Sequence, residues 1–474
     1  MSIFRSLITN TASRSVAELL NRFGSAIFWM LIARMLGLSA LGSISFALYL
    51  FALFETISVL GLPAVVIRDL SRSRENAATY FGNLLLMGLS SSICLGMVMV
   101  AIAYWLKPNA DTLFAVKMMA LALIPATAFT WSRAMLTAAE KMSYIAVSRA
   151  AENIFKVVVG VTLLCNGGGI RSLLVVVALS KVVSFVVCYV YAIRKVVAPS
   201  WKFDRKLFKS FLHQAPAFFS IAVFNSLFWS LSVIMITKMR GETDAGLFSA
   251  AFKIVDLCLA FTAAFGYALY PVISRISRKD HSLFQSLCIR SIKYVLILTL
   301  AISAGVTVLS SQIVMLLYGA DSMAAAPVLS AMIWLIMPFS VAYILAYSLL
   351  SYEKQKLDLI SNIVATFTLF FGNLLLLPGY GVWGATFAIL LGCFIFVALQ
   401  YFWVARELFK IRITGRILRP VLSVVSMVVV VFWLRDKNVF LSVAAGSVVF
   451  LINLWLTKTI TLYDLAFLKR LSSI

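Results

Sequence analysis

Long apolar runs alternate with short polar or basic connections along nearly the whole chain. Each run extends for roughly twenty residues, the length that an α-helix needs to cross a bilayer. The pattern predicts about fourteen transmembrane helices. Their expected ranges are 15–36, 43–67, 79–104, 112–138, 145–165, 171–193, 211–238, 246–274, 291–316, 325–350, 358–377, 382–405, 419–434 and 438–457.

The connections on the two sides of the predicted membrane differ in charge. If the amino terminus is cytoplasmic, the outer connections hold only Lys107, Arg171, Arg240, Arg435 and Lys437. The inner connections hold most of the remaining Lys and Arg, and the positive-inside rule assigns such connections to the cytoplasm. We therefore expect a multi-pass protein with both termini in the cytoplasm.

Composition supports a membrane protein and argues against a nucleic-acid-binding protein and against a fold stabilised by metal or disulfides. Of 474 residues, 62% are hydrophobic and only 12% are charged, whereas soluble domains carry about 25% charged residues. The net charge of +23 is spread over short loops, so we expect no nucleic-acid partner. The six cysteines show no paired spacing, and neither a metal site nor a disulfide framework is expected. No phosphate-binding loop is present, so transport energy would come from a gradient, with H⁺ or Na⁺ as candidate coupling ions and no other cofactor.

Several uncommon residues recur at constant offsets in the two halves of the chain. Chance alignment of apolar helices is the alternative explanation, but prolines and charged pairs that recur in register favour a duplication. The matched pairs are Gly37 with Gly241, Gly42 with Gly246, Ser45 with Ser249, Pro125 with Pro338, Glu140 with Glu353 and Gly168 with Gly381.

The duplication predicts an all-α integral membrane fold built from two six-helix lobes in parallel repeat, with a site between the lobes. The first lobe covers 1–193, and a basic cytoplasmic linker covers 194–210. The second lobe covers 211–405. Residues 406–474 form an additional helix pair and a cytoplasmic tail.

Ionisable residues inside the predicted spans are the candidates for function, because each is costly in a membrane interior. Glu55, Glu152, Lys156, Lys181 and Asp256 lie near mid-depth, and all such residues precede residue 260. The shallower ones, which can extend to the interface, are Glu18, Arg22, Lys117, Arg133 and Lys253.

Two explanations remain open for the mid-depth charges. They line a hydrated passage, with the first lobe making most of the recognition contacts, or they form structural ion pairs. Glu152 and Lys156 have the favourable i, i+4 order for such a pair, and Lys253 with Asp256 is a second candidate pair. The aromatic candidates for stacking on sugars, with core packing as the alternative, are Trp131, Trp229, Tyr343 and Tyr347.

Three stretches resemble a known family. "LIARMLGLSALGSISFALYLFALFETISVLGLPAVVIRDLSR", its counterpart "MRGETDAGLFSAAFKIVDLCLAFTAAFGYALYPVISR" and the turn "YGVWGATFAILLG" are similar to the polysaccharide/oligosaccharide exporter family of the MOP (MATE-like) superfamily. The likeness covers essentially the whole chain. The nearest subfamily in pattern is the Wzx-type O-antigen flippases.

The resemblance implies a V-shaped pair of lobes in the bacterial inner membrane. It also implies a substrate, undecaprenyl-pyrophosphate-linked glycan of the lipopolysaccharide type, moved outward by alternating access. Expected partners are this lipid-linked glycan, membrane lipid and the polymerase and chain-length machinery of the same pathway. The additional helix pair is a candidate groove for the lipid tail.

On this reading the basic residues attract the diphosphate or acidic sugars, and the acidic residues balance charge or couple ions. The basic set is Arg22, Arg133, Lys156, Lys181 and Lys253, and the acidic set is Glu55, Glu152 and Asp256.

Three other functions remain as alternatives. A drug or metabolite cation antiporter of the same superfamily usually has twelve helices. A membrane-embedded polymerase or ligase needs a sizeable outer loop with catalytic residues, and the predicted outer loops are minimal. A scaffold would leave the mid-membrane charges unexplained. We therefore expect a transporter and not an enzyme.

Overall fold

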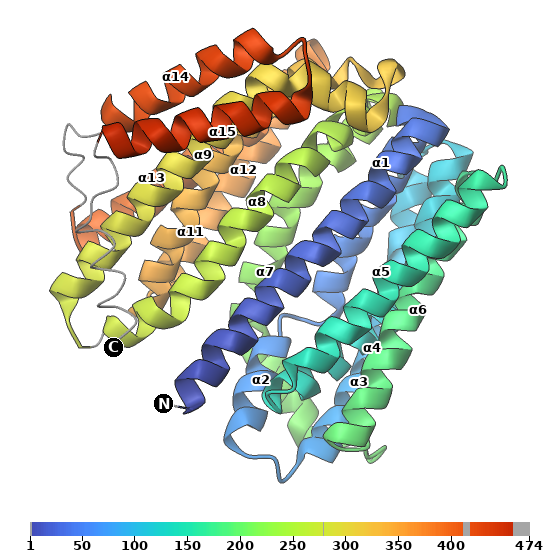
Figure 1. Ribbon diagram of the computed structural model, residues 1–474. Helices are drawn as coiled ribbons and strands as arrows, with labels where there is room; N and C mark the ends of the chain where they lie inside the picture. Colours follow the sequence, from blue (N-terminus) through green and yellow to red (C-terminus); the bar gives the residue numbers. More distant parts are fainter. Residues whose placement is uncertain (1, 278, 411–417, 458–474) are drawn as a thin grey trace. The chain divides into compact units, whose positions relative to one another are not determined.

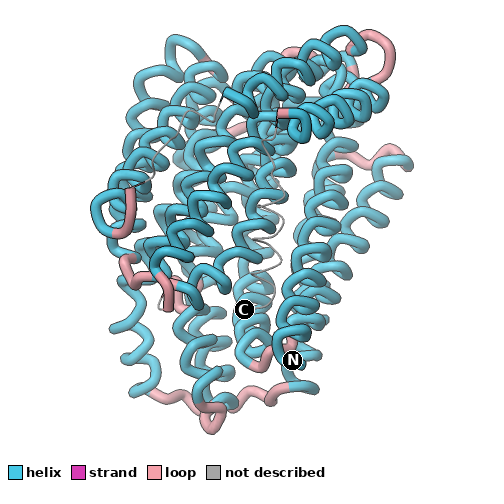
Figure 2. Tube along the Cα trace, turned by 60° about the vertical axis from the view of Figure 1, so that its left-hand side comes forward, coloured by secondary structure: helices cyan, strands magenta, loops and turns pink. Residues whose placement is uncertain are grey.

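The computed structural model describes residues 2–277, 279–410 and 418–457, and within these ranges every regular element is a helix. Short loops join the helices, as Figure 2 shows. Eleven helices of the described part are long and apolar enough to cross a membrane. The α-helices are α1 (Ser2–Ser58), α2 (Pro63–Arg72), α3 (Ala77–Leu106), α4 (Ala110–Ala138), α5 (Met142–Cys165), α6 (Ile170–Lys195), α7 (Arg205–Arg240), α8 (Glu242–Ile276), α9 (His281–Tyr318), α10 (Ala325–Met332), α11 (Ile336–Ser351), α12 (Gln355–Tyr380), α13 (Val382–Glu407), α14 (Leu418–Leu434) and α15 (Val439–Leu456).

The all-α, many-span architecture predicted from the apolar runs is confirmed. Two details differ. The predicted spans 15–36 and 43–67 join into α1, which changes direction at Gly37 (φ 83°, ψ 174°) and ends at Ser58. Helix α9 begins at His281 and not at 291, because a helix continues through polar residues beyond the membrane core that hydropathy detects.

The chain divides into two compact units, Met1–Lys253 with Leu359–Gly392 and Ile254–Asp358 with Cys393–Ile474. In the first unit, α4 packs on α3 and α6, α5 packs on α6, and α1 contacts α4, α5 and α7. Figure 1 shows α5 and α6 beside each other in this unit. One of its apolar clusters includes Phe81, Trp131 and Leu136, all fully buried.

In the second unit, α9 is the central helix, against which α10, α11, α14 and α15 pack. Helices α14 and α15 lie side by side along α9 (Figure 1). Among the described residues of this unit, Asp358 at the start of α12 is a buried carboxylate: it is 9% exposed and accepts a hydrogen bond from the Gln400 amide at 2.5 Å. The predicted lobe boundaries at 193 and 211 divide the chain by its sequence repeat, whereas the two units divide it by contacts, so these boundaries stay a prediction.

The internal repeat is visible in backbone geometry. Gly37 (φ 83°) and Gly241 (φ 91°) both interrupt the helical path with ψ close to 180°, a conformation that favours glycine. Glu140 and Glu353 both adopt φ 60°, although each carries a side chain. Matching left-handed residues at matching positions are difficult to obtain without a duplication.

The repeated glycines also make a close helix crossing inside the first unit. A Cβ at Gly42 would lie 1.8 Å from the Glu242 carbonyl oxygen, and one at Gly246 would lie 1.8 Å from that of Leu38. Small residues allow membrane helices to approach at this distance. The Glu242 carboxylate then accepts a hydrogen bond from the Asn109 N–H at 2.9 Å, at the start of α4. These contacts join α1, α4 and α8 at the end predicted to lie outside.

Candidate functional site

One face of α5 carries the charges around which the candidate site is built. Arg149, Glu152, Lys156 and Gly160 recur at intervals of three or four residues, so they share a face of the helix. Glu152 and Lys156 are each only 7% exposed. Such charges need partners inside the protein, because a bilayer interior cannot solvate them.

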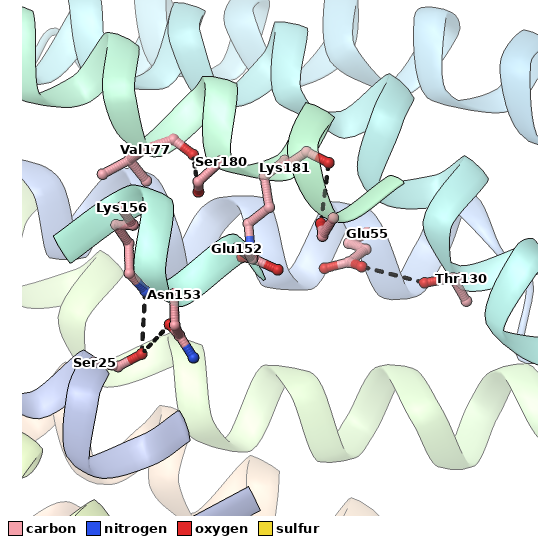
Figure 3. Close-up of polar contacts among 10 residues, drawn as sticks. Ser25, Glu55, Thr130, Glu152, Asn153, Lys156, Val177, Ser180 and Lys181 are labelled. Carbon is pink, nitrogen blue, oxygen red and sulfur yellow. Dashed lines mark hydrogen bonds and ion pairs between the residues drawn. The ribbon is translucent and has the colours of Figure 1, made fainter. Parts of the chain in front are cut away.

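Glu152 finds its partner on the neighbouring helix. Its carboxylate Oε1 lies 2.6 Å from the Nζ of Lys181 on α6, with side chains 9% and 24% exposed. Figure 3 shows the Lys181 chain extending toward this carboxylate. The ion pair that Glu152 makes is therefore between helices, whereas the i, i+4 order suggested Lys156 as its partner.

Lys156 is held by a short hydrogen-bond chain to α1. Its Nζ donates to Ser25 Oγ at 3.1 Å, and Ser25 Oγ donates to Asn153 Oδ1 at 2.9 Å. Figure 3 shows Lys156 and Asn153 both directed toward Ser25. The chain orients the ammonium group toward α1 and away from the Glu152–Lys181 pair.

Aromatic rings of α1 complete the surroundings of the lysines. The Trp29 ring centroid lies 5.9 Å from the Nζ of Lys156 and 5.0 Å from the Nζ of Lys253, within the range of cation–π attraction. Phe28 lies 5.7 Å from the Nζ of Lys156. A Cβ at Gly160 would lie 2.4 Å from the Phe28 ring, so this glycine allows α1 to pack closely on α5.

The structure brings four residues of the predicted set into one region: Glu152, Lys156, Lys181 and Lys253. We call these four residues, with Arg149 and Trp29, the lysine cluster. Four of these side chains are basic and one is acidic, so the region has an excess of positive charge. Its ammonium and guanidinium groups are charged hydrogen-bond donors, which suits an anionic ligand.

The other predicted residues lie elsewhere. Glu55 on α1 accepts a hydrogen bond from the Thr130 hydroxyl of α4 at 3.4 Å. Arg133 on α4 is half-buried. Asp256 on α8 is half-buried and belongs to the second unit. The Arg22 side chain lies outside the described residues.

Sequence reasoning missed Arg149, Ser25 and Trp29. Arg149 had a usable signal, because it precedes Glu152 and Lys156 by three and seven residues on one helix. Ser25 and Trp29 had none, since serine and tryptophan are ordinary in apolar helices.

Of the proposed sugar-stacking residues, Trp131 is fully buried, and Trp229 packs on Phe228 and Phe252. Within the described ranges no group of three or more metal-ligating side chains occurs.

A family model described as "Polysaccharide biosynthesis protein" matches residues 7–277, more than half of the chain. The chain belongs to the polysaccharide biosynthesis protein family. The matched region contains the whole lysine cluster. A search of curated proteins finds no sequence relative.

Solved structures show which fold this family member has. The lipid II flippase MurJ in an inward closed conformation superposes with a TM-score of 0.78 at 17% identity, covering 96% of this chain and 100% of that one. A multidrug resistance MATE transporter of the MOP superfamily, inward-facing, has a TM-score of 0.67 at 13% identity and covers 83% and 98%. A MOP superfamily transporter from Pyrococcus furiosus has a TM-score of 0.60 at 13% identity, covering 84% and 95%.

The predicted membership of a MOP-type exporter family is thus confirmed. The family and the fold together support a multi-pass membrane transporter or flippase of the MOP superfamily. They leave the substrate open.

Proposed function

We propose that this family member is a flippase that moves an undecaprenyl-diphosphate-linked oligosaccharide from the cytoplasmic to the outer leaflet of a bacterial inner membrane. The observation that carries the proposal is the lysine cluster, in which one buried and three half-buried cationic side chains share a single carboxylate inside membrane helices. Family membership and the likeness to a lipid II flippase agree with a lipid-linked substrate.

The physical requirement for such a flippase is a polar path for the head group. Sugar hydroxyls and a diphosphate lose their hydration in hydrocarbon at a cost of several kcal/mol for each unpaired group. Lys156 and Lys253 would replace water around the diphosphate, with Lys181, Arg133 and Arg22 supplying further positive charge. The polyprenyl tail would remain in lipid throughout.

The carboxylates would balance this charge in the empty carrier. Glu152 already binds Lys181, and an arriving diphosphate would compete for that lysine. Glu55 and Asp256 would serve as further counter-charges. Coupling to H⁺ or Na⁺ through one of the three carboxylates belongs to the same proposal, as does an orientation with both termini cytoplasmic.

The test is transport by purified protein in liposomes. Fluorescently labelled undecaprenyl diphosphate carrying a short oligosaccharide is placed in both leaflets, and accessibility to an external glycosidase reports flipping. We expect acceleration by the wild-type chain and its loss in Lys156→Met. A matched control is Lys117→Met, which removes a half-buried lysine of α4 that lies 5.1 Å from the Tyr104 ring.

Two outcomes would contradict the proposal. Gradient-driven uptake of a small organic cation such as ethidium, with no flipping of the lipid probe, would identify a cation antiporter. Equal flipping by wild type and Lys156→Met would remove the lysine cluster from the path. Collapse of the proton or sodium gradient in the same liposomes tests the coupling ion.

A further inference from the structure

Three aromatic residues recur along one face of α11 in the second unit. Phe339, Tyr343 and Tyr347 are four residues apart, so each lies roughly 6 Å further along the helix than the one before. The ring centroids of Phe339 and Tyr343 are 4.7 Å apart, and those of Tyr343 and Tyr347 are 6.2 Å apart with planes inclined by only 16°.

A fourth ring extends this row onto α8. Tyr270 lies 5.0 Å from Tyr347, centroid to centroid. The Tyr347 ring occupies space that a glycine provides, since a Cβ at Gly266 would lie 3.0 Å from it. We call Tyr343, Tyr347 and Tyr270 the tyrosine track.

Burial distinguishes the track from ordinary core packing. Phe339, at the deep end of the row, is 4% exposed and packs on Phe396 at 6.0 Å. The three tyrosines that follow are only half-buried. A half-buried tyrosine combines an apolar ring face with a polar hydroxyl, which suits a ligand that itself has apolar faces and hydroxyl groups.

The track adjoins an open pocket. Tyr270 lines a cavity of about 570 Å³ together with Pro271, Ser274, Arg275 and Lys279. Apart from the proline, each of these side chains carries a hydrogen-bonding group. A polar ligand in this pocket therefore contacts Tyr270, the end ring of the track.

We propose that the tyrosine track and its pocket form a glycan-binding site, in which sugar rings stack on Tyr343, Tyr347 and Tyr270. The site deepens the proposed function and rests on it, because it names the part of the substrate that the second unit recognises. Pyranose rings have C–H faces for the aromatic rings and rim hydroxyls for the tyrosine hydroxyls and the pocket. One turn of α11 separates successive rings, so an oligosaccharide contacts more of the track than one sugar does.

The test measures binding to the full chain in lipid nanodiscs with two probes. One is undecaprenyl diphosphate without sugar, and the other is undecaprenyl diphosphate carrying an N-acetylglucosamine tetrasaccharide. We expect Tyr343→Ala/Tyr347→Ala to weaken binding of the tetrasaccharide probe roughly tenfold and to leave the sugar-free probe within about twofold. The double phenylalanine variant, which keeps both rings, should remain within about threefold for both probes.

Tyr401→Ala is the matched control, because Tyr401 is a tyrosine of the same unit on α13 that is 40% exposed. It should leave both affinities unchanged. If the double alanine variant fails to fold, Tyr343→Leu/Tyr347→Leu keeps apolar volume without a ring and should show the same tenfold loss.

Outcomes separate the two proposals. Wild-type binding of both probes with equal affinity, or equal loss of both in the alanine variant, overturns the glycan site while the flippase stands. Wild-type binding of neither probe overturns both. Selective loss of the tetrasaccharide probe alone supports the site.

Discussion

The lysine cluster of the first unit and the tyrosine track of the second use different chemistry. The first holds four basic side chains and one carboxylate, ordered by an ion pair of 2.6 Å and by the hydrogen bonds of Ser25. The second holds neutral amphipathic rings, and its only charged groups in the proposed site are Arg275 and Lys279 of the adjoining pocket. Charge attracts an anion over a distance, whereas stacked rings act only at contact.

The difference indicates how one substrate with two kinds of chemistry would be recognised. A lipid-linked glycan has a charged diphosphate and a neutral, hydroxyl-rich oligosaccharide. A diphosphate is common to all such lipids, so a cationic site cannot distinguish one glycan from another. Under our proposals the lysine cluster therefore supplies affinity for the class, and the tyrosine track supplies contacts that depend on the sugars.

The largest effect is expected for Lys156→Met, which keeps most of the apolar stem of the side chain and removes its charge. In the proposed complex Lys156 and the diphosphate form a buried charge pair. Truncating one partner of such a pair costs about 2–5 kcal/mol, so transport and binding of undecaprenyl diphosphate should fall about thirtyfold or more. Affinity measured on the sugar-free probe checks this. An equal loss of affinity in Lys117→Met would mean that removing the charge of any partly buried lysine in the first unit weakens binding.

A double-mutant cycle on Glu152 and Lys181 comes next in size. Glu152→Leu or Lys181→Met alone leaves the other charge buried, at a cost of about 3–5 kcal/mol in stability. The double variant should recover most of the thermal stability, because neither charge remains. Transport should stay impaired, since Lys181 also belongs to the proposed path. Recovery of both stability and transport would show that the pair is only structural.

The sequence was sufficient for the helical class and roughly for the number of helices, because apolar runs of membrane length are an unusually strong signal. It also placed Glu152 and Lys156 inside the protein, where each is only 7% exposed, since mid-span charges avoid lipid. The sequence repeat also pairs Gly37 with Gly241, and the two glycines share one backbone conformation.

Partner choice was not predictable from the same information. Spacing along one helix suggested Lys156 for Glu152, but the rotation of α5 against α6 decides which side chains meet, and Lys181 lies across that interface. Trp29 enters the site only because α1 packs on α5 at Gly160. The tyrosines of α11 have helical spacing that fits a core stripe equally well, and their half-burial was needed to separate the two.

Trp29 is the intermediate case, an aromatic residue that belongs to the charged region. Its ring lies near both Lys156 and Lys253, and a cation–π contact contributes about 0.5–2 kcal/mol. Trp29→Leu should weaken binding of undecaprenyl diphosphate about three- to tenfold, and Trp29→Phe should recover part of it. Both probes should be affected equally. A loss of affinity for the tetrasaccharide probe alone would instead make Trp29 a sugar-binding ring. Sugar contacts would then not be confined to the tyrosine track.

The smallest effect is expected at Asp358, the buried carboxylate of the second unit. Gln400 donates a hydrogen bond to it at 2.5 Å, and Asp358→Asn keeps an oxygen acceptor in the same place while removing the charge. A hydrogen bond to a neutral acceptor is weaker than one to a carboxylate by about 1 kcal/mol, which sets the scale of the expected change in stability. Flipping in liposomes should remain within about twofold. Abolished flipping in a stably folded Asp358→Asn protein would place an essential carboxylate in the second unit, and the assignment of the charge-balancing carboxylate at the substrate path to Glu152 of the first unit would then be wrong.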